Sequence, residues 1–391
     1  MDANKCEVSV VLPCLNEEKT IEECIRRAKK ALAEADILGE VVVADNGSTD
    51  RSTKIAQVEG ARVVIAKVAG YGNALFAGFA EAQGKFIIFL DADLSYEFSH
   101  IPRFVEELRN GADLVMGSRF KGTIDHGAMP FLHRYFGTPF LTKVASIFFK
   151  CNISDVNCGM RGLTKETFER LDLKSGGMEF ASEMIIKASL LKVNIVEIPT
   201  DLHRDQRGRR PHLRSFSDGW RHLRFMLLFC PVWLFFVPGL FLIIGGIGGS
   251  VVIIFDKVPP LGIGASLIGL TCVVLGVQIV LLGIATLGFS QIRKLRVDKS
   301  FLGHLFSYLT LEKGIILGSL FCGIGFFVLS YAGLRIYQFM LSGSYLPGQV
   351  DILSTKLALL GTIIFAIGTQ VVFSSFFLGL FNIEPVSTDD K

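Results

Sequence analysis

The sequence is short of the cysteine patterns that mark metal or redox sites. Its eight cysteines include no Cys-x-x-Cys pair and have no histidine partner at metal spacing, which argues against a zinc finger or a dithiol centre. In a cytoplasmic domain, scattered cysteines are most simply reduced packing residues. The net charge is only +3, which is too small to indicate a nucleic-acid partner.

Charged residues are scarce in the second part of the chain. From Pro231 onward there are nine Lys or Arg and seven Asp or Glu, against 40 and 37 in the whole chain. Long apolar runs fill this part, and each reaches the roughly 20 residues that cross the hydrocarbon core of a bilayer. We therefore expect an all-α transmembrane domain of residues 231–391, with four helices at about 234–255, 261–289, 314–334 and 357–381.

Basic residues flank these apolar runs unevenly. Seven arginines lie between Arg204 and Arg224, before the first run, and four basic residues lie between Arg293 and Lys299, after the second. Because cytoplasmic loops carry the excess of Lys and Arg, we expect an integral protein of the cell (inner) membrane whose first domain, middle loop and C-terminal tail face the cytoplasm. We expect no secretory signal, because Val8–Leu12 is too short and lacks a basic lead.

Apolar runs alternate with amphipathic stretches through the first 120 residues. This alternation predicts an α/β domain, residues 1–230, with a mostly parallel sheet and helices on both faces. The expected strands are Val8–Leu12, Glu40–Ala44, Arg62–Ala66, Phe86–Leu90 and Asp113–Met116, and helices are expected to begin near Glu18, Thr49, Tyr71 and His100.

Two carboxylates, Asp91 and Asp93, follow the fourth expected strand directly. Open α/β sheets bind ligands at the carboxyl edge of their strands, so we expect both acids at such a site. Like charges in one site need a neutralising cation, and Mg²⁺ prefers one or two carboxylates together with substrate phosphates. An acid-x-acid triplet is also common in solvated turns, so the triplet alone leaves both interpretations open.

Polar residues also follow the second expected strand and precede the third helix. Asp45 is expected at the same sheet edge as Asp91, where it could bind a base or a ribose, and Ser48 or Thr49 would cap the following helix. The glycines of Gly70-Tyr71-Gly72-Asn73 would let backbone amides approach a phosphate. Turn and cap chemistry alone would also account for most of these residues.

Taken together, the motifs resemble the family-two glycosyltransferases of the GT-A (Rossmann-like) fold. More narrowly, they resemble the polyprenyl-phosphate glycosyltransferases, the group that includes dolichol-phosphate mannose synthases. The resemblance covers about the first 230 residues, and the membrane part resembles multi-span members only in helix count and placement. The motifs that carry it are Pro13-x-x-Asn16-Glu17, Asp45–Asp50, Gly70–Gly72, Asp91–Asp93, Gly117–Arg119, Asp155–Gly162 and Glu179–Met184.

The resemblance implies roles for the residues at matching positions. Asp91, Asp93, Arg119 and Arg134 would form the catalytic group, with Mg²⁺ or Mn²⁺ as cofactor. The implied nucleotide-binding residues are Pro13, Leu15, Glu17, Val43, Asp45, Asp91 and Ala92. The implied ligands of donor or lipid phosphate are Arg119, Arg134, Arg204 and Arg207, and the implied metal ligands are Asp91, Asp93 and Ser95.

Three positions depart from the family pattern. Tyr71 replaces the lysine of the usual Gly-Lys-Gly, which removes a possible phosphate ligand, and Ser95 stands where Gln is frequent. The usual Gly-x-Ser-Lys before the membrane is Gly208-Arg209-Arg210. The motif therefore does not say which arginine of that segment contacts phosphate; the candidates are Arg204, Arg207, Arg209 and Arg210.

The resemblance implies an inverting enzyme that moves a hexose from a nucleotide-sugar, of the UDP-glucose or GDP-mannose type, to polyprenyl phosphate. A homo-oligomer is compatible with it. A processive polysaccharide synthase is one alternative, but it needs a Gln-x-x-Arg-Trp motif, and Gln206–Arg210 lacks the Trp. A non-catalytic transporter subunit with a nucleotide-sensing domain is another, but transporters carry ionisable residues within their spans. Here Gln278 and Gln370 are the main polar residues in the spans.

Overall fold

The computed structural model of the protein describes residues 6–207, 215–254, 262–292, 311–341 and 352–380. The chain divides into two compact units, Met1–Phe229 and Cys230–Lys391. The first unit is an α/β domain, and the described part of the second consists of apolar helices.

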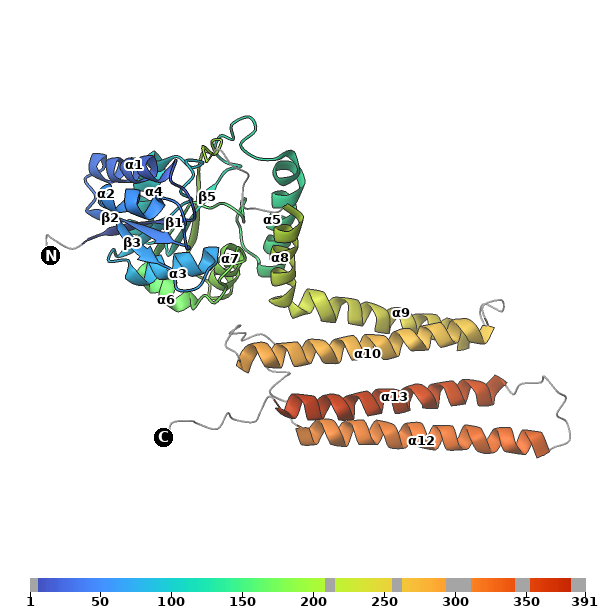
Figure 1. Ribbon diagram of the computed structural model, residues 1–391. Helices are drawn as coiled ribbons and strands as arrows, with labels where there is room; N and C mark the ends of the chain where they lie inside the picture. Colours follow the sequence, from blue (N-terminus) through green and yellow to red (C-terminus); the bar gives the residue numbers. More distant parts are fainter. Residues whose placement is uncertain (1–5, 208–214, 255–261, 293–310, 342–351, 381–391) are drawn as a thin grey trace, which may run out of the picture. The chain divides into compact units, whose positions relative to one another are not determined.

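A seven-stranded mixed sheet forms the centre of the first unit (Figure 1). Its strand order is β3-β2-β1-β4-β6-β5-β7. Only β6 runs antiparallel to its neighbours, β4 and β5, whereas the other pairs are parallel. The strands are β1 Val8–Cys14, β2 Gly39–Asp45, β3 Arg62–Ile65, β4 Phe86–Phe89, β5 Leu114–Ser118, β6 Arg161–Thr164 and β7 Ile195–Pro199. The α/β fold with a mostly parallel sheet is confirmed.

Helices cover both faces of this sheet because the central strands are apolar on both sides. Helices α1 and α4 pack on the face that carries Val8 and Val10, and α3, α6 and α7 lie on the other face (Figure 1). The helices of this unit are α1 Ile21–Glu34, α2 Ser52–Val58, α3 Tyr71–Glu81, η1 Phe98–His100, α4 Ile101–Arg109, η2 His133–Gly137, α5 Thr138–Phe149, α6 Lys165–Leu171, α7 Phe180–Leu190 and α8 Ser215–Leu228.

The second helix, α2, is capped by a different residue from the two that the sequence suggested. Neither Ser48 nor Thr49 caps α2, because the helix begins only at Ser52. Asp50 takes that part instead: its Oδ1 accepts the backbone N–H of Ser52 at 2.9 Å. The Ser48 hydroxyl accepts the N–H of Asn16 at 2.9 Å, so it joins the loops after β1 and β2.

Four helices in the described part of the second unit are long and apolar enough to cross a membrane. They are α9 Val237–Ile254, preceded by η3 Val232–Phe236, then α10 Gly262–Ile292, α12 Leu311–Leu341 and α13 Ile352–Leu380. Helix α12 is longer than the expected run 314–334, and it therefore contains Arg335, the residue directly after that run.

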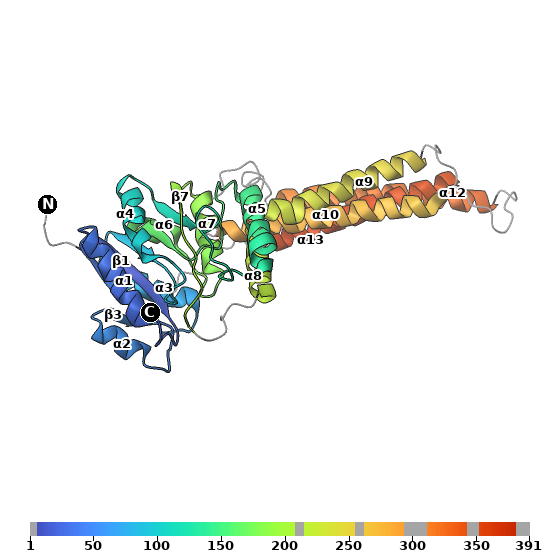
Figure 2. The ribbon, with the colours of Figure 1, turned by 90° about the horizontal axis from the view of Figure 1, so that it is seen from above.

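The four helices pack in two pairs, α9 with α10 and α12 with α13 (Figures 1 and 2). Glycines let the backbones meet in both pairs. A Cβ at Gly246 would lie 2.4 Å from the carbonyl oxygen of Gly269, and one at Gly318 would lie 2.8 Å from that of Gly368. Each contact recurs seven residues along the helix, at Gly239–Gly276 and at Gly325–Gly361. Such close approach is typical of helix packing in membranes.

Candidate active site

A cavity of about 630 Å³ opens where β1 and β4 end, at the edge where open α/β sheets bind ligands. The structure brings most of the sequence-predicted site residues together around it. Those that line it are Pro13, Leu15, Glu17, Asp91, Ala92, Asp93, Ser95, Arg119 and Arg207.

The other predicted residues are not among the described residues that line this cavity. Val43 is buried within β2, and the Asp45 carboxylate accepts the N–H groups of Gly47 and Ser48 at 3.1 and 3.2 Å. Turn chemistry therefore accounts for Asp45 in this structure. Arg204 donates instead to the carbonyl oxygen of His126.

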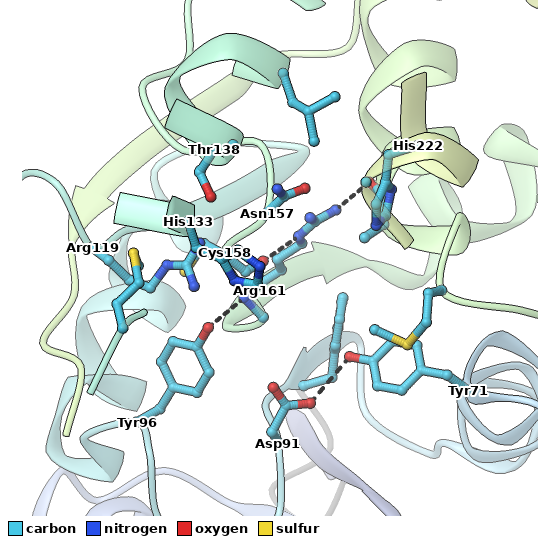
Figure 3. Close-up of a pocket in the computed structure, with 18 residues that line it drawn as sticks. Tyr71, Asp91, Tyr96, Arg119, His133, Thr138, Asn157, Cys158, Arg161 and His222 are labelled. Atoms are coloured by element: carbon cyan, nitrogen blue, oxygen red, sulfur yellow. Dashed lines mark hydrogen bonds between the residues drawn. The ribbon is translucent and has the colours of Figure 1, made fainter. Parts of the chain in front are cut away.

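Asp91 lies between Tyr71, which is partly buried, and Tyr96, which is buried (Figure 3). The hydroxyl of Tyr71 donates to Asp91 Oδ1 at 3.3 Å. Tyr96 accepts the N–H of Gly159 at 2.7 Å, and a Cβ on Gly159 would lie 2.7 Å from Asp91 Oδ2. Burial raises the pKa of Tyr71 well above its usual value, so its hydroxyl stays protonated and acts as the donor.

Asp93 has a partner on each of its carboxylate oxygens. Oδ1 accepts the backbone N–H of Ser95 at 3.0 Å, and Oδ2 accepts from Arg207 Nη2. Arg207 also forms an ion pair with Glu17, in which Nε lies 3.5 Å from Oε1. One guanidinium thus neutralises two buried acids that come from different strand ends.

A smaller cavity of about 180 Å³ shares a wall with the larger one, formed by Tyr71, Asp91 and Arg119 among others. It is the cavity drawn in Figure 3, into which Arg119, His133 and Arg161 also face. Burial and the charge of Arg119 lower the pKa of His133, so its ring is neutral at neutral pH. Among the described residues, two arginines and one acid, Asp91, line this cavity, which makes it suitable for an anion.

Both arginines are fixed by protein groups. Arg119 donates to Asp155 from Nε at 2.6 Å and from Nη2 at 2.8 Å. This pair uses two of the five N–H donors of a guanidinium, so Arg119 keeps donors for a ligand. Arg161 is fully buried and donates to the carbonyl oxygens of Cys158, Ala181 and Val156 at 2.7–3.0 Å. No salt bridge of the described residues pairs Arg161 with a carboxylate; burial lowers the pKa of Arg161, and the nearby charge of Asp155 opposes that shift.

The glycines at the start of α3 make room for protein backbone in this structure. A Cβ at Gly72 would lie 2.2 Å from the carbonyl oxygen of Ser175, and Asn73 N donates to Gly176 O at 3.2 Å. Glu183 in turn fixes this loop, because it accepts the N–H of Ser175 at 2.7 Å. The glycines were expected to let backbone amides approach a phosphate. In the structure they instead let the backbone of Ser175 and Gly176 approach α3.

The segment from Phe131 to Phe140 has two different faces. His133, Gly137 and Thr138 line the smaller cavity. Phe131 and Phe136 are 70% and 60% exposed, and the guanidinium of Arg134 lies over the Tyr135 ring, 5.7 Å from its centroid. Arg134 thus directly follows His133, which lines the cavity, and it lies on a segment with exposed aromatic side chains.

The acids at the larger cavity fit a divalent cation that arrives with its substrate. The described residues contain no group of three or more His, Cys, Asp or Glu placed to hold a metal by themselves. Asp91 and Asp93 supply two carboxylates, and Mg²⁺ commonly completes such a set with substrate phosphates. The Ser95 side chain lines the same cavity.

Comparison with known proteins gives the family. The chain matches the family model "Glycosyl transferase family 2" over residues 9–172 and the model "Glycosyltransferase family 2 C-terminal transmembrane region" over residues 284–382. The low-salt glycan biosynthesis hexosyltransferase Agl6 of Haloferax volcanii is 39% identical over 386 residues, which cover 95% of this chain and 88% of that protein. The chain belongs to glycosyltransferase family 2. It is a glycosyltransferase and a membrane protein.

Two further comparisons each cover a little over half of the chain. A dolichyl-phosphate hexose transferase of Haloferax volcanii is 29% identical over 216 residues, which cover 54% of this chain and 89% of that protein. Glucosyl-3-phosphoglycerate synthase of Mycobacterium tuberculosis, crystallised with Mn²⁺, UDP and its product, has a TM-score of 0.47 and 24% identity, covering 57% of this chain and 80% of that one.

Sequence reasoning missed several residues that shape the site of this family 2 enzyme. Tyr71 was noted only as a missing lysine, and Tyr96 and His133 gave no signal. Asp155 and Arg161 belong to the run Asp155–Gly162 that matched the family pattern, so that run was the available clue to them.

Proposed function

We propose that the protein transfers a hexose from a nucleotide-sugar to the phosphate of a polyprenyl lipid, with inversion at the anomeric carbon. The observation that carries the proposal is the shared wall between the acid-lined cavity and the arginine-lined cavity, to which Asp91 and Arg119 both contribute. Two sites that meet in this way suit two phosphorylated substrates that must react with each other.

The larger cavity would take the donor. Glu17, Pro13 and Leu15 would surround the nucleoside, while Asp91 and Asp93 would hold Mg²⁺ or Mn²⁺ together with the diphosphate. Such a cation supplies neutralisation of the charge that develops on the leaving diphosphate. Val43 and Asp45 stay proposed nucleoside residues, the latter through the turn that its carboxylate closes.

The smaller cavity would take the acceptor phosphate, with Arg119 and Arg161 stabilising it. An oxygen of this phosphate forms a bond to the anomeric carbon, and the bond from that carbon to the diphosphate breaks. The electron pair leaves with the nucleoside diphosphate. Because the lipid phosphate is already ionised at neutral pH, no residue has to remove a proton. Arg134 and Arg204 stay proposed phosphate ligands on the strength of their motif positions.

Two features support a lipid acceptor. Phe131, Tyr135, Phe136 and Phe140 are exposed on the segment that lines the arginine cavity, and exposed aromatic residues beside basic ones are typical of membrane-surface segments. Relatives of this chain are named as a hexosyltransferase of glycan biosynthesis and as a dolichyl-phosphate hexose transferase. The distribution of Lys and Arg supports a cytoplasmic active site in a cell (inner) membrane.

The test is a lipid-extraction assay with the purified full-length protein. It is incubated with Mg²⁺ or Mn²⁺, polyprenyl phosphate and a panel of radiolabelled nucleotide-sugars, and label is then counted in the organic phase. We expect label from one donor to enter the lipid only when polyprenyl phosphate is present. Label in a growing water-insoluble polymer would favour a processive polysaccharide synthase, and no transfer from any donor would favour a transporter subunit.

A further inference from the structure

Arg207 lies between two acids of the larger cavity. Its Nη2 contacts Asp93, and its Nε lies 3.5 Å from Glu17 Oε1. The side chains are well shielded, with exposed fractions of 15% for Arg207 and 6–7% for the two acids. A protein cation therefore stands at the carboxylate that the proposed function assigns to the divalent cation.

The backbone around Arg207 fixes it at this position. Gln206 N donates to the carbonyl oxygen of Asp93 at 3.1 Å, and His203 N donates to that of Ser95 at 2.8 Å. The segment that follows β7 is thus hydrogen-bonded to the turn that follows β4, and Arg207 comes directly after it. The contact with Asp93 follows from these backbone bonds, which hold the end of the segment over the turn.

The acids need this charge. Glu17, Asp91 and Asp93 line one cavity, and buried like charges without a counter-ion are costly. Burial by itself would lower the pKa of Arg207, but the charges of Asp93 and Glu17 outweigh burial and raise it. Asp93 then has a partner on each carboxylate oxygen, Ser95 N–H on Oδ1 and Arg207 on Oδ2.

We propose that Arg207 is the counter-ion of the donor site when no donor is bound, and that it moves from Asp93 to the donor diphosphate when a divalent cation arrives. The proposal rests on the proposed function, because it requires Asp93 to be a ligand of that cation. A guanidinium and a divalent cation at Asp93 Oδ2 repel each other, so arrival of the cation favours release of the guanidinium. The displaced guanidinium has anionic diphosphate oxygens to pair with, and such pairs are strong.

This exchange has a thermodynamic consequence. A divalent cation alone must displace Arg207 from Asp93 and offers it no new partner. A cation that arrives with a nucleoside diphosphate offers that partner at once. Arg207 therefore couples the two ligands, so that each one strengthens the binding of the other by the same factor.

The experiment measures Mn²⁺ binding to the full-length protein in detergent, from the electron paramagnetic resonance of free Mn²⁺, without nucleotide and with UDP or GDP. In Arg207→Ala, Mn²⁺ alone should bind more tightly than in the wild type, by about 5- to 150-fold, which is the usual size of such couplings. The further gain on adding the nucleotide should shrink. Arg207→Lys, which keeps the charge, should stay close to the wild type in the absence of nucleotide.

Two further variants sharpen the comparison. Arg109→Ala removes an arginine that pairs with Glu7 and is not among the described residues that line the cavity, so its Mn²⁺ affinity should be unchanged. Arg207→Gln removes the charge but keeps a donor, and it replaces Arg207→Ala if the latter does not fold.

The possible failures can be told apart. If the wild type binds Mn²⁺ with a nucleotide but loss of the Arg207 charge leaves the affinity for Mn²⁺ alone unchanged or weaker, Arg207 is not the counter-ion and the proposed function stands. If no form of the protein binds Mn²⁺ with either nucleotide, Asp93 is not a cation ligand, and the proposed metal site falls together with this inference.

Discussion

Asp155 holds the guanidinium of Arg119 in two parallel hydrogen bonds, of 2.6 Å from Nε and 2.8 Å from Nη2. The carboxylate is fully buried, and the Asp155 N–H is itself held by Glu197 at 3.2 Å. The arginine that faces both cavities is therefore oriented before any substrate binds, which reduces the ordering that binding would otherwise require.

Asp155→Asn should destabilise the protein and impair transfer. Asparagine keeps the shape of the side chain but leaves the charge of Arg119 buried without a partner, which costs about 3–5 kcal/mol. The melting temperature of the full-length protein in detergent should fall by roughly 10 °C. The control is Asp172→Asn, at an exposed pair with Lys174, where a change of at most about 1 kcal/mol is expected. Equal effects of the two substitutions would contradict this role of Asp155.

Asp91→Asn and Asp93→Asn should each reduce transfer by about a hundredfold or more, the usual effect of losing a group that stabilises charge in a transition state. EDTA should inactivate the wild type, and added Mg²⁺ or Mn²⁺ should restore it. Rates are measured by lipid extraction, and circular dichroism checks that the variants are folded. Near-normal turnover of either variant with excess cation would remove that residue from the proposed cation site.

Transfer should fall as the pH drops through about 6. Burial and the neighbouring Asp93 raise the pKa of Asp91 to about 6, and a protonated carboxyl group is a poor cation ligand. The Tyr71 hydrogen bond opposes this rise, so Tyr71→Phe should move the acidic limb of kcat/KM to higher pH. The measurement is kcat/KM of both proteins from about pH 5 to about pH 8. If the acidic limb of Tyr71→Phe is not shifted, protonation of Asp91 does not control that limb.

The same shift predicts a gain in stability when Asp91 is replaced. The folded-state pKa lies above the unfolded value of 3.8, so the charged form disfavours the fold above about pH 6, and this cost disappears as the pH falls toward 4. At neutral pH, Asp91→Asn should therefore melt at a higher temperature than the wild type while it loses transfer. A lower melting temperature would show that ionised Asp91 is well paired in the folded protein.

The exposed aromatic residues should matter for the lipid and not for the nucleotide-sugar. Phe136→Ser and Phe140→Ser should raise the KM for polyprenyl phosphate several-fold, because each removes apolar area that would contact the membrane or the prenyl chain. Val58→Ser is the matched control, since Val58 is 85% exposed on α2, away from this segment. A raised KM for the donor instead would place these residues at the other substrate.

Reporter fusions should find the C-terminal tail in the cytoplasm. A reporter that is active only outside the cytoplasm should be silent when fused after Lys391 and active when inserted near Pro259. The reason is the excess of Lys and Arg before the first span and after the second. The reverse pattern would put the proposed donor site on the wrong side of the membrane.

The strands that the sequence predicted are those that can be recognised from their own residues, without knowing which strands they pair with. β1, β2 and β4 are apolar runs, because they are buried on both faces, and their ends were correct to within two residues. β6 was not expected. Its four residues include Arg161 and only one strictly apolar side chain, Leu163, and it becomes a strand by pairing antiparallel with β4 and β5.

The candidate site also contains residues that the local sequence indicates and contacts that it does not. Asp91 and Asp93 could be found because they follow β4 directly. Their partners could not, since Tyr71 lies 20 residues before Asp91 and Arg207 lies 114 residues after Asp93. Only the folded chain brings these side chains into contact: the motifs marked the positions of Tyr71 and Arg207, but not their contacts with the two acids.

The seven-residue glycine spacing has a consequence for the order in which the membrane helices can assemble during synthesis. Gly246 and Gly269 join α9 to α10, and Gly318 and Gly368 join α12 to α13, so each helix pair contains both halves of its own backbone contacts. In lipid, such contacts replace the hydrophobic force that would drive helices together in water. Once α10 has been synthesised, α9 and α10 therefore have all the residues of their mutual backbone contacts. This pair can pack in the bilayer while α12 and α13 are still being synthesised.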